Sequence, residues 1–161
     1  HLYISIWFYV ATVVVMGVLL AVNAIALPTE QWRSIPLLAG AHDAMMQWWY
    51  GHNVLTFLLT VPFIGFLYYF IPKLTEQPVF SYKLAILHFW SYLFICVMAG
   101  PHHLHYTALP EWLSTLGMLF GIMLWLPAWG AVINWLSTLR GAWSKVRQEV
   151  TLQFFAAAVV F

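Results

Sequence analysis

The chain has 161 residues, of which 63% are hydrophobic and 19% aromatic, while only 7% are charged. Soluble domains carry roughly 25% charged residues, so this composition excludes a globule in water and indicates membrane lipid as the surrounding solvent. The net charge of +1 indicates no nucleic acid or acidic partner, and the single Cys96 excludes an internal disulfide and a cysteine-rich zinc or iron–sulfur site. A soluble helical bundle remains as the disfavoured alternative.

Four apolar runs are long enough to cross a bilayer, which takes about 20 residues. They cover residues 3–27, 45–71, 82–101 and 112–138, and a truncated fifth run begins near 150. The predicted fold class is all-α, a polytopic transmembrane helix bundle, with residues 1–161 forming a fragment of one transmembrane domain. We expect a fragment because the sequence starts at His1 and ends inside an apolar run.

Basic residues are distributed unequally between the two sides of these spans. Arg33 alone lies in the first and third connections, whereas the second and fourth, with the adjoining helix ends, hold Lys73, Lys83, Arg140, Lys145 and Arg147. Positive residues are enriched in cytoplasmic loops, so the second and fourth connections are predicted to be cytoplasmic. The third connection then faces outward, into the periplasm of a Gram-negative cell.

Three histidines are predicted to meet at one depth. His52 precedes the cytoplasmic Pro72 by 20 residues, and His102 follows Tyr82, across the same loop, by 20 residues. At about 1.5 Å per residue, both lie about 30 Å from that loop. His103 is adjacent to His102 but points about 100° away on a regular helix, so both face one point only if the Gly-Pro pair before them distorts the turn.

Three neutral imidazoles suit copper or zinc, and ionisable groups inside a membrane are candidates for function. The alternative is that each histidine bonds separately to a carbonyl or to a lipid headgroup. The other histidines are weaker candidates: His42 is expected at the interface, His105 in a loop, and His88 in mid-helix, as a residue of packing or of a polar path.

Four motifs extend this interpretation: "DAMMQWWYGHN", "YYFIPK", "SYKLAILHFW" and "AGPHHLHYTALPEW". Together they resemble subunit I of the cbb3-type cytochrome c oxidases, a branch of the haem–copper oxidases. The resemblance implies a twelve-helix subunit of the bacterial inner membrane in which His52, His102 and His103 bind the copper called CuB. It further implies haem b and haem b3, with ligands outside this segment, and reduction of O2 to water with electrons from cytochrome c through c-type cytochrome subunits.

One position departs from the family. The resemblance implies a tyrosine six residues before the histidine pair, cross-linked to the first copper histidine, but Cys96 stands there. Thr56 occupies the position where a different branch has its tyrosine. The missing tyrosine leaves open a nitric oxide reductase of the same superfamily, which reduces NO and also lacks it. We favour the oxidase, because those reductases place glutamates near the metal and no acidic residue lies deep in a span here. A non-catalytic membrane subunit is the remaining alternative.

Polar residues on two spans predict a route for protons. His52, Thr56 and Thr60 recur every four residues on one helix. His88, Tyr92 and Cys96 do the same on the next, with Ser91 beside them. Each set of residues forms a polar stripe along one face of its helix. The two stripes are expected to face each other between the cytoplasmic side and the metal. The alternative is that the hydroxyls bond only to the backbone one turn back.

Overall fold

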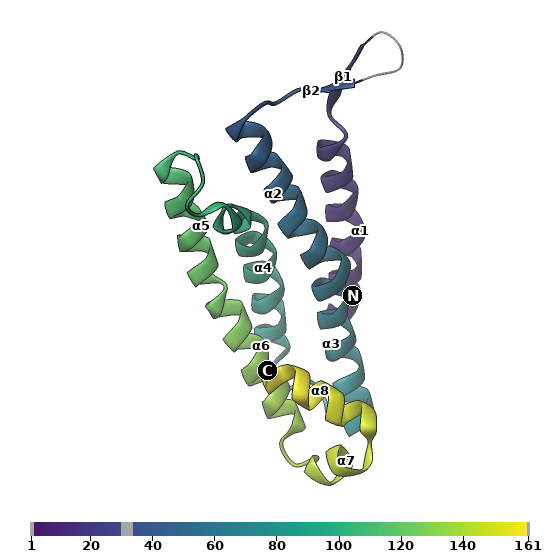
Figure 1. The fold of residues 1–161 in the computed structure, drawn as a ribbon. Helices are drawn as coiled ribbons and strands as arrows, with labels where there is room; N and C mark the ends of the chain where they lie inside the picture. The colour runs from purple at the N-terminus through teal and green to yellow at the C-terminus, as the bar shows by residue number, and fades with distance from the viewer. Residues whose placement is uncertain (1, 30–33, 161) are drawn as a thin grey trace.

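The computed structural model describes residues 2–29 and 34–160, which form an elongated bundle of helices (Figure 1). The elements in chain order are α1 (Ile4–Asn23), β1 (Ala26–Pro28), β2 (Ser34–Pro36), α2 (Ala41–Leu55), the π-helical segment η2 (Thr56–Thr60), α3 (Val61–Thr75), α4 (Tyr82–Met98), the 3-10 segment η3 (Gly100–Leu104), α5 (Glu111–Met123), α6 (Trp125–Leu139), α7 (Trp143–Gln148) and α8 (Val150–Val160). One end of the bundle carries the strands, and the other carries α7 (Figure 1).

The predicted all-α membrane bundle is confirmed. Four helical segments are long and apolar enough to span a membrane: Ile4–Asn23, Ala41–Thr75, Tyr82–Leu104 and Glu111–Leu139. Large apolar side chains remain on the surface of these segments, among them Phe94 at 66% and Trp125 at 73% exposure. Such a surface requires an apolar surrounding, either lipid or further helices.

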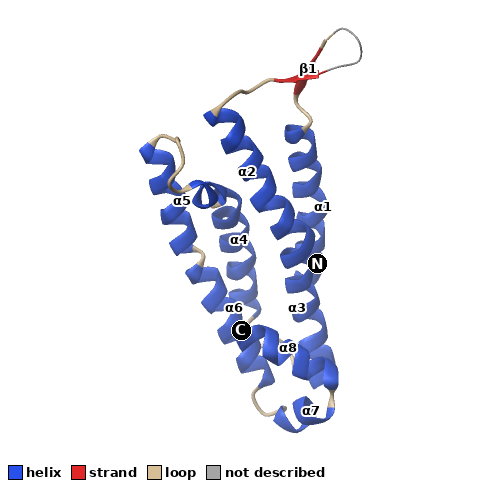
Figure 2. Ribbon diagram, viewed as in Figure 1, coloured by secondary structure: helices blue, strands red, loops and turns tan. Residues whose placement is uncertain are grey.

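The first span is shorter than expected, because the helix ends at Asn23 and the next residues form a strand. Leu27 pairs with Ile35 in an antiparallel two-stranded hairpin, the only strand pair among the described residues (Figure 2). Hydrophobicity alone extended the predicted helix to residue 27, but Ala26–Pro28 bonds across the hairpin to Ser34–Pro36 and is therefore extended. Arg33 and His1, named in the sequence analysis, lie outside the described residues.

The second and fourth spans are each interrupted. In the second, the π-helical segment η2 precedes Pro62, which is near the start of α3 and has no N–H for the helical hydrogen bond one turn back. In the fourth, α5 ends at Met123 and α6 begins at Trp125, with Pro127 in its first turn. The wider π turn changes which residues share a face, so a strict spacing of four no longer aligns side chains across it.

An aromatic cluster fixes α1, α3, α4 and α6 against one another below the histidines. Phe8 stacks on Tyr68 with ring centroids 5.6 Å apart, and it meets the edge of Phe89 at 5.1 Å. Trp135 of α6 lies 5.3 Å from Tyr68 and 5.8 Å from His88, measured between ring centroids. Because these contacts join α3 to α4, they set the height of one helix against the other in the antiparallel pair.

The basic residues gather at the end of the bundle opposite the strands. Lys73 lies in the last turn of α3 and Lys83 in the first turn of α4. Arg140 follows α6, and Lys145 and Arg147 lie on α7. The short helix α7 was not predicted, because its six residues carry too little periodicity to distinguish them from a charged loop. The described basic residues therefore all lie at this one end.

An ion pair ties α7 to the end of α3, and its contribution depends on pH. Lys145 Nζ lies 2.8 Å from Glu76 Oε2 and donates to the Thr75 carbonyl at 3.2 Å. The hydrogen bond and the charge of Lys145 lower the pKa of Glu76 from its usual 4.5. The stability that the pair contributes is therefore fully present above about pH 4.5 and is lost as the pH falls through the lowered pKa.

We expect Glu76→Gln to lower the melting temperature slightly at neutral pH, because an exposed ion pair is screened by solvent. The difference from the parent protein should shrink as the pH falls below about 4.5. Thermal unfolding in detergent at neutral and acidic pH measures it. A difference that grows on acidification would contradict this assignment.

Candidate metal centre

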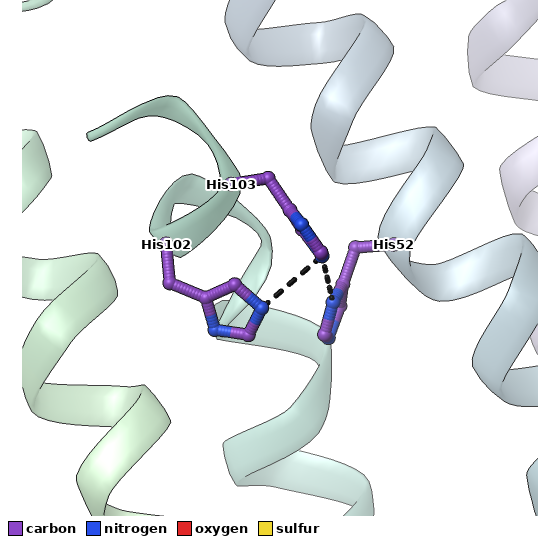
Figure 3. Close-up of side chains that lie close together, drawn as sticks. All are labelled: His52, His102 and His103. Atoms are coloured by element: carbon purple, nitrogen blue, oxygen red, sulfur yellow. Dashed lines mark hydrogen bonds between the residues drawn. The ribbon is translucent and has the colours of Figure 1, made fainter. Parts of the chain in front are cut away.

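Three imidazoles converge where α2 meets the segment after α4 (Figure 3). His52 Nδ1 lies 3.1 Å from His103 Nε2, and His102 Nε2 lies 3.1 Å from the same nitrogen. The candidate ligand atoms of all three residues lie within 4.8 Å of one another. The structure thus brings together the three histidines selected from the sequence.

The turn that lets two adjacent histidines face one point is the 3-10 segment η3. The predicted helix 82–101 ends early, at Met98, and η3 continues from Gly100. Pro101 has no N–H, so the helical bond to the Val97 carbonyl cannot form. The His102 N–H instead donates to the Ala99 carbonyl at 3.0 Å, three residues back. This tighter winding turns both rings toward His52.

Glycines allow η3 to lie close to its neighbours. A Cβ on Gly117 of α5 would stand 2.5 Å from the His102 backbone nitrogen and 2.7 Å from the Pro101 carbonyl carbon. A Cβ on Gly100 would stand 3.1 Å from the Trp49 Cα atom of α2. The histidine turn is therefore clamped between α5 and α2.

A carbonyl oxygen determines which nitrogen of His52 is free. His52 Nε2 donates its proton to the Cys96 carbonyl at 3.1 Å, so Nδ1 carries the lone pair that faces His103. The Cys96 thiol sulfur lies 3.5 Å from the same Nε2. Cys96 is thus on the far side of the ring from the other histidines, and it touches a candidate ligand without belonging to the set.

The donor set fits a metal ion. Two nitrogens that bind one metal at about 2.0–2.1 Å lie roughly 3–3.5 Å apart, which agrees with the 3.1 Å contacts. A neutral imidazole nitrogen either donates one proton or accepts one, so His103 Nε2 cannot form two ordinary hydrogen bonds to its two partners. A cation among the three nitrogens satisfies all of them at once.

The surroundings of the three rings differ. His52 is the most enclosed, and His103 is exposed on the surface of the described bundle. Trp48 stacks on His103 with ring centroids 4.9 Å apart and an angle of 24° between the planes. A Cβ on Gly121 would stand 3.3 Å from His102 Nδ1, so this ring also lies against α5.

The two predicted stripes meet at Cys96, whose thiol lies 3.5 Å from His52 Nε2 and is approached by Thr56. Thr56 Oγ1 donates to the His52 carbonyl at 2.8 Å, and Ser91 Oγ donates to the Leu87 carbonyl at 2.7 Å. Both hydroxyls thus bond to the backbone one turn back. Thr60, at the end of the π-helical segment, is exposed.

A buried polar contact that the sequence analysis missed lies below the metal centre. The Tyr68 hydroxyl and His88 Nδ1 are 2.9 Å apart, and His88 is only 2% exposed. The His88 and Tyr92 rings follow at 5.7 Å between centroids, and Tyr92 and Thr56 both approach the Cys96 thiol. Tyr68 lies in an aromatic run of the sequence, which predicts a packing role. The only feature that indicated a polar role was its hydroxyl in an apolar span.

The remaining histidines lie outside the cluster. His42 is exposed at the start of α2. His105 follows η3, and its ring lies 6.5 Å from that of Tyr106, centroid to centroid. Among the described residues, His52, His102 and His103 form the one group of histidine, cysteine or acidic side chains close enough to hold a metal ion.

Apolar spans that bring three imidazoles together define a helical membrane protein with a histidine cluster that could hold a metal ion. The chain belongs to the family described as Cytochrome C and Quinol oxidase polypeptide I, whose pattern it matches over residues 1–161.

The sequence is 50% identical to cytochrome c oxidase subunit 1 of Rhodobacter capsulatus, over 100% of this chain and 31% of that protein. It is 51% identical to the bacteroid cytochrome c oxidase subunit 1 homolog of Bradyrhizobium diazoefficiens, over 100% and 30%. It is 47% identical to the cbb3-type cytochrome c oxidase subunit CcoN1 of Stutzerimonas stutzeri, over 100% and 34%. The chain thus spans about a third of the length of these relatives. The resemblance inferred from the motifs is confirmed.

Proposed function

We propose that this chain is the copper-binding part of the catalytic subunit of a cbb3-type haem–copper oxidase. The complex would reduce O2 to water with electrons from cytochrome c, delivered through c-type cytochrome subunits, and couple this reaction to proton movement. The convergence of three imidazoles from two membrane helices is the observation that carries the proposal. The names of the relatives support it, since they are cytochrome c oxidase subunits.

In this proposal, His52 Nδ1, His102 Nε2 and His103 Nε2 hold the copper CuB. When bound, the copper supplies one of the redox centres at which O2 is reduced. The Cys96 carbonyl fixes the tautomer of His52, and Trp48 holds the plane of the His103 ring. The ligands of haem b and haem b3 are assigned to parts of the subunit outside this chain.

The orientation follows from charge. The described basic residues lie at the α7 end, which we assign to the cytoplasm of a bacterial inner membrane. The histidine cluster lies toward the opposite end, beneath the loop between η3 and α5 (Figure 1). The metal centre is therefore proposed on the periplasmic side.

We place the proton route from Tyr68 of α3 through His88 and Tyr92 of α4 to Cys96 beside His52. Tyr68 and His88 are within hydrogen-bonding distance, and Tyr92 approaches the thiol. Each of these groups is able to bind a proton or hold a water molecule. Thr60 is left out, because its side chain is exposed in the described bundle.

We expect Tyr92→Phe and Tyr68→Phe each to lower steady-state O2 consumption at least about tenfold, with copper and haem content unchanged, because proton supply becomes limiting. Tyr69→Phe is the matched control, since it removes a hydroxyl from a tyrosine that faces outward and is 42% exposed. The measurement is turnover of the purified complex. Rates within about twofold of the parent in both test variants would refute the route.

Nitric oxide reduction is the second candidate, and the observation that favours it is Cys96 at the position where the resemblance implies a tyrosine. Metal analysis and turnover of the purified full-length complex separate the alternatives. Copper together with haem and rapid O2 consumption support the oxidase. The same metals with NO consumption alone support the reductase, and the absence of any metal supports a non-catalytic subunit.

A further inference from the structure

The residue after His52 makes an unusual pair of contacts. Asn53 is fully buried, and its amide Nδ2 donates to the Trp49 carbonyl at 2.8 Å and to the Val97 carbonyl at 3.2 Å. Trp49 lies on the same helix, α2, whereas Val97 lies near the end of α4. Asn53 therefore joins the helix of one candidate ligand to the helix that leads to the other two.

The Val97 carbonyl is available because of the proline that shapes the histidine turn. In a regular helix, the residue four positions later would donate its N–H to this oxygen, but that residue is Pro101. The neighbouring Cys96 carbonyl accepts from His52 Nε2 at 3.1 Å. Two consecutive side chains of α2 thus donate to two consecutive carbonyls at the end of α4.

The orientation of the Asn53 amide follows from its surroundings. Both contacts are carbonyl oxygens, so the NH2 group must face them and Oδ1 must point away. Oδ1 is buried and has no hydrogen-bond partner among the described residues. Asn53 therefore satisfies one interhelical carbonyl while leaving one oxygen of its own unpaired. The bond to the Val97 carbonyl joins two helices, so it fixes the geometry between α2 and the end of α4.

We propose that Asn53 is a positioning residue of the metal centre. Its bond to Val97 holds the end of α4 at a fixed distance from α2, and η3 continues from that point with His102 and His103. Without this bond, the contact of His52 with the Cys96 carbonyl is the one hydrogen bond left between α2 and the end of α4 among the described residues, so the 3.1 Å spacing between His52 and His103 is less firmly fixed. The proposal rests on the proposed copper function of the three histidines.

The test uses Asn53→Leu in the full-length subunit within its complex, with Asn134→Leu as the matched control. Asn134 is also fully buried, and it also joins two elements, through bonds of 2.9 and 3.1 Å to the backbone of Ser81 at the far end of α4. A milder variant, Asn53→Ser, keeps a polar side chain that is too short for the same span. The readouts are copper per haem and the copper X-ray absorption spectrum, which reports the number of bound imidazoles.

We expect both Asn53 variants to weaken copper binding about 10–100-fold, as removal of groups that orient metal ligands does, with haem content retained. Copper that remains should show fewer imidazoles or a wider spread of copper–nitrogen distances, whereas Asn134→Leu should keep the parent spectrum. Full copper with an unchanged spectrum in either Asn53 variant would overturn the proposal. So would failure of both Asn53 variants to assemble while Asn134→Leu assembles, since that result assigns Asn53 to folding. A parent complex without copper would instead refute the proposed function.

Discussion

Replacing His103 by alanine should remove copper from the complex and abolish turnover while leaving haem content intact. The Nε2 atom of His103 lies 3.1 Å from a nitrogen of each of the other two histidines. Removing His103 therefore leaves only two of the three proposed ligands. Two imidazoles at the edge of a membrane span do not replace a three-ligand set. We expect copper to fall below about a tenth of the parent value, measured by elemental analysis against haem absorbance.

The matched control for this experiment is His105→Ala. His105 lies two residues further along, just after η3, and it does not belong to the histidine cluster. His105→Ala removes the same chemical group from the same region but no candidate ligand, so copper and activity should be retained. Full copper and full activity in His103→Ala would refute the ligand assignment of this residue. Equal loss in His105→Ala would indicate that the loop, and not the ligand, controls the site.

Gly117→Ala should create the closest contact of any glycine-to-alanine change among the described residues. The added Cβ would stand 2.5 Å from the His102 nitrogen and 2.7 Å from the Pro101 carbonyl carbon, and neither backbone atom can rotate away. Either α5 or η3 must shift, and overpacking of this kind typically costs about 1–3 kcal/mol or more. Because η3 carries two candidate ligands, we expect copper to be lost together with stability.

Gly17→Ala on α1 provides the control, since a Cβ there meets no atom within 4 Å. It should be neutral or slightly stabilising, because alanine favours a helix by about 1 kcal/mol over glycine. Gly121→Ala should fall between the two, because its Cβ would meet the His102 ring at 3.3 Å. Thermal unfolding and copper content of the three variants should follow this order. Normal copper and stability in Gly117→Ala would contradict the close approach of α5 to η3.

The sequence by itself determined the membrane class, the order of the four spans and the identity of the three clustered histidines. Composition sufficed for the class because a 7% charged chain cannot cover itself in water. Counting residues sufficed for the histidines because a helix rises by a constant amount per residue, so equal counts from one loop reach equal depth. His52 and His102 obey this rule, and their rings lie 4.8 Å apart between centroids.

Only the tertiary structure decided the contacts at the points where a regular α-helix is interrupted. The π-helical segment before Pro62 interrupted the regular spacing from Thr56 to Thr60, and the 3-10 turn at Pro101 aimed both histidines at one point. The same turn left the Val97 carbonyl without a helical N–H donor, and the Asn53 amide donates to it. Prolines mark such breaks in the sequence, but the direction in which the chain continues depends on the helices packed against it. The free nitrogen of His52 and the hydroxyl of Tyr68 beside His88 are likewise set by partners distant in sequence, which residue spacing along one helix does not encode.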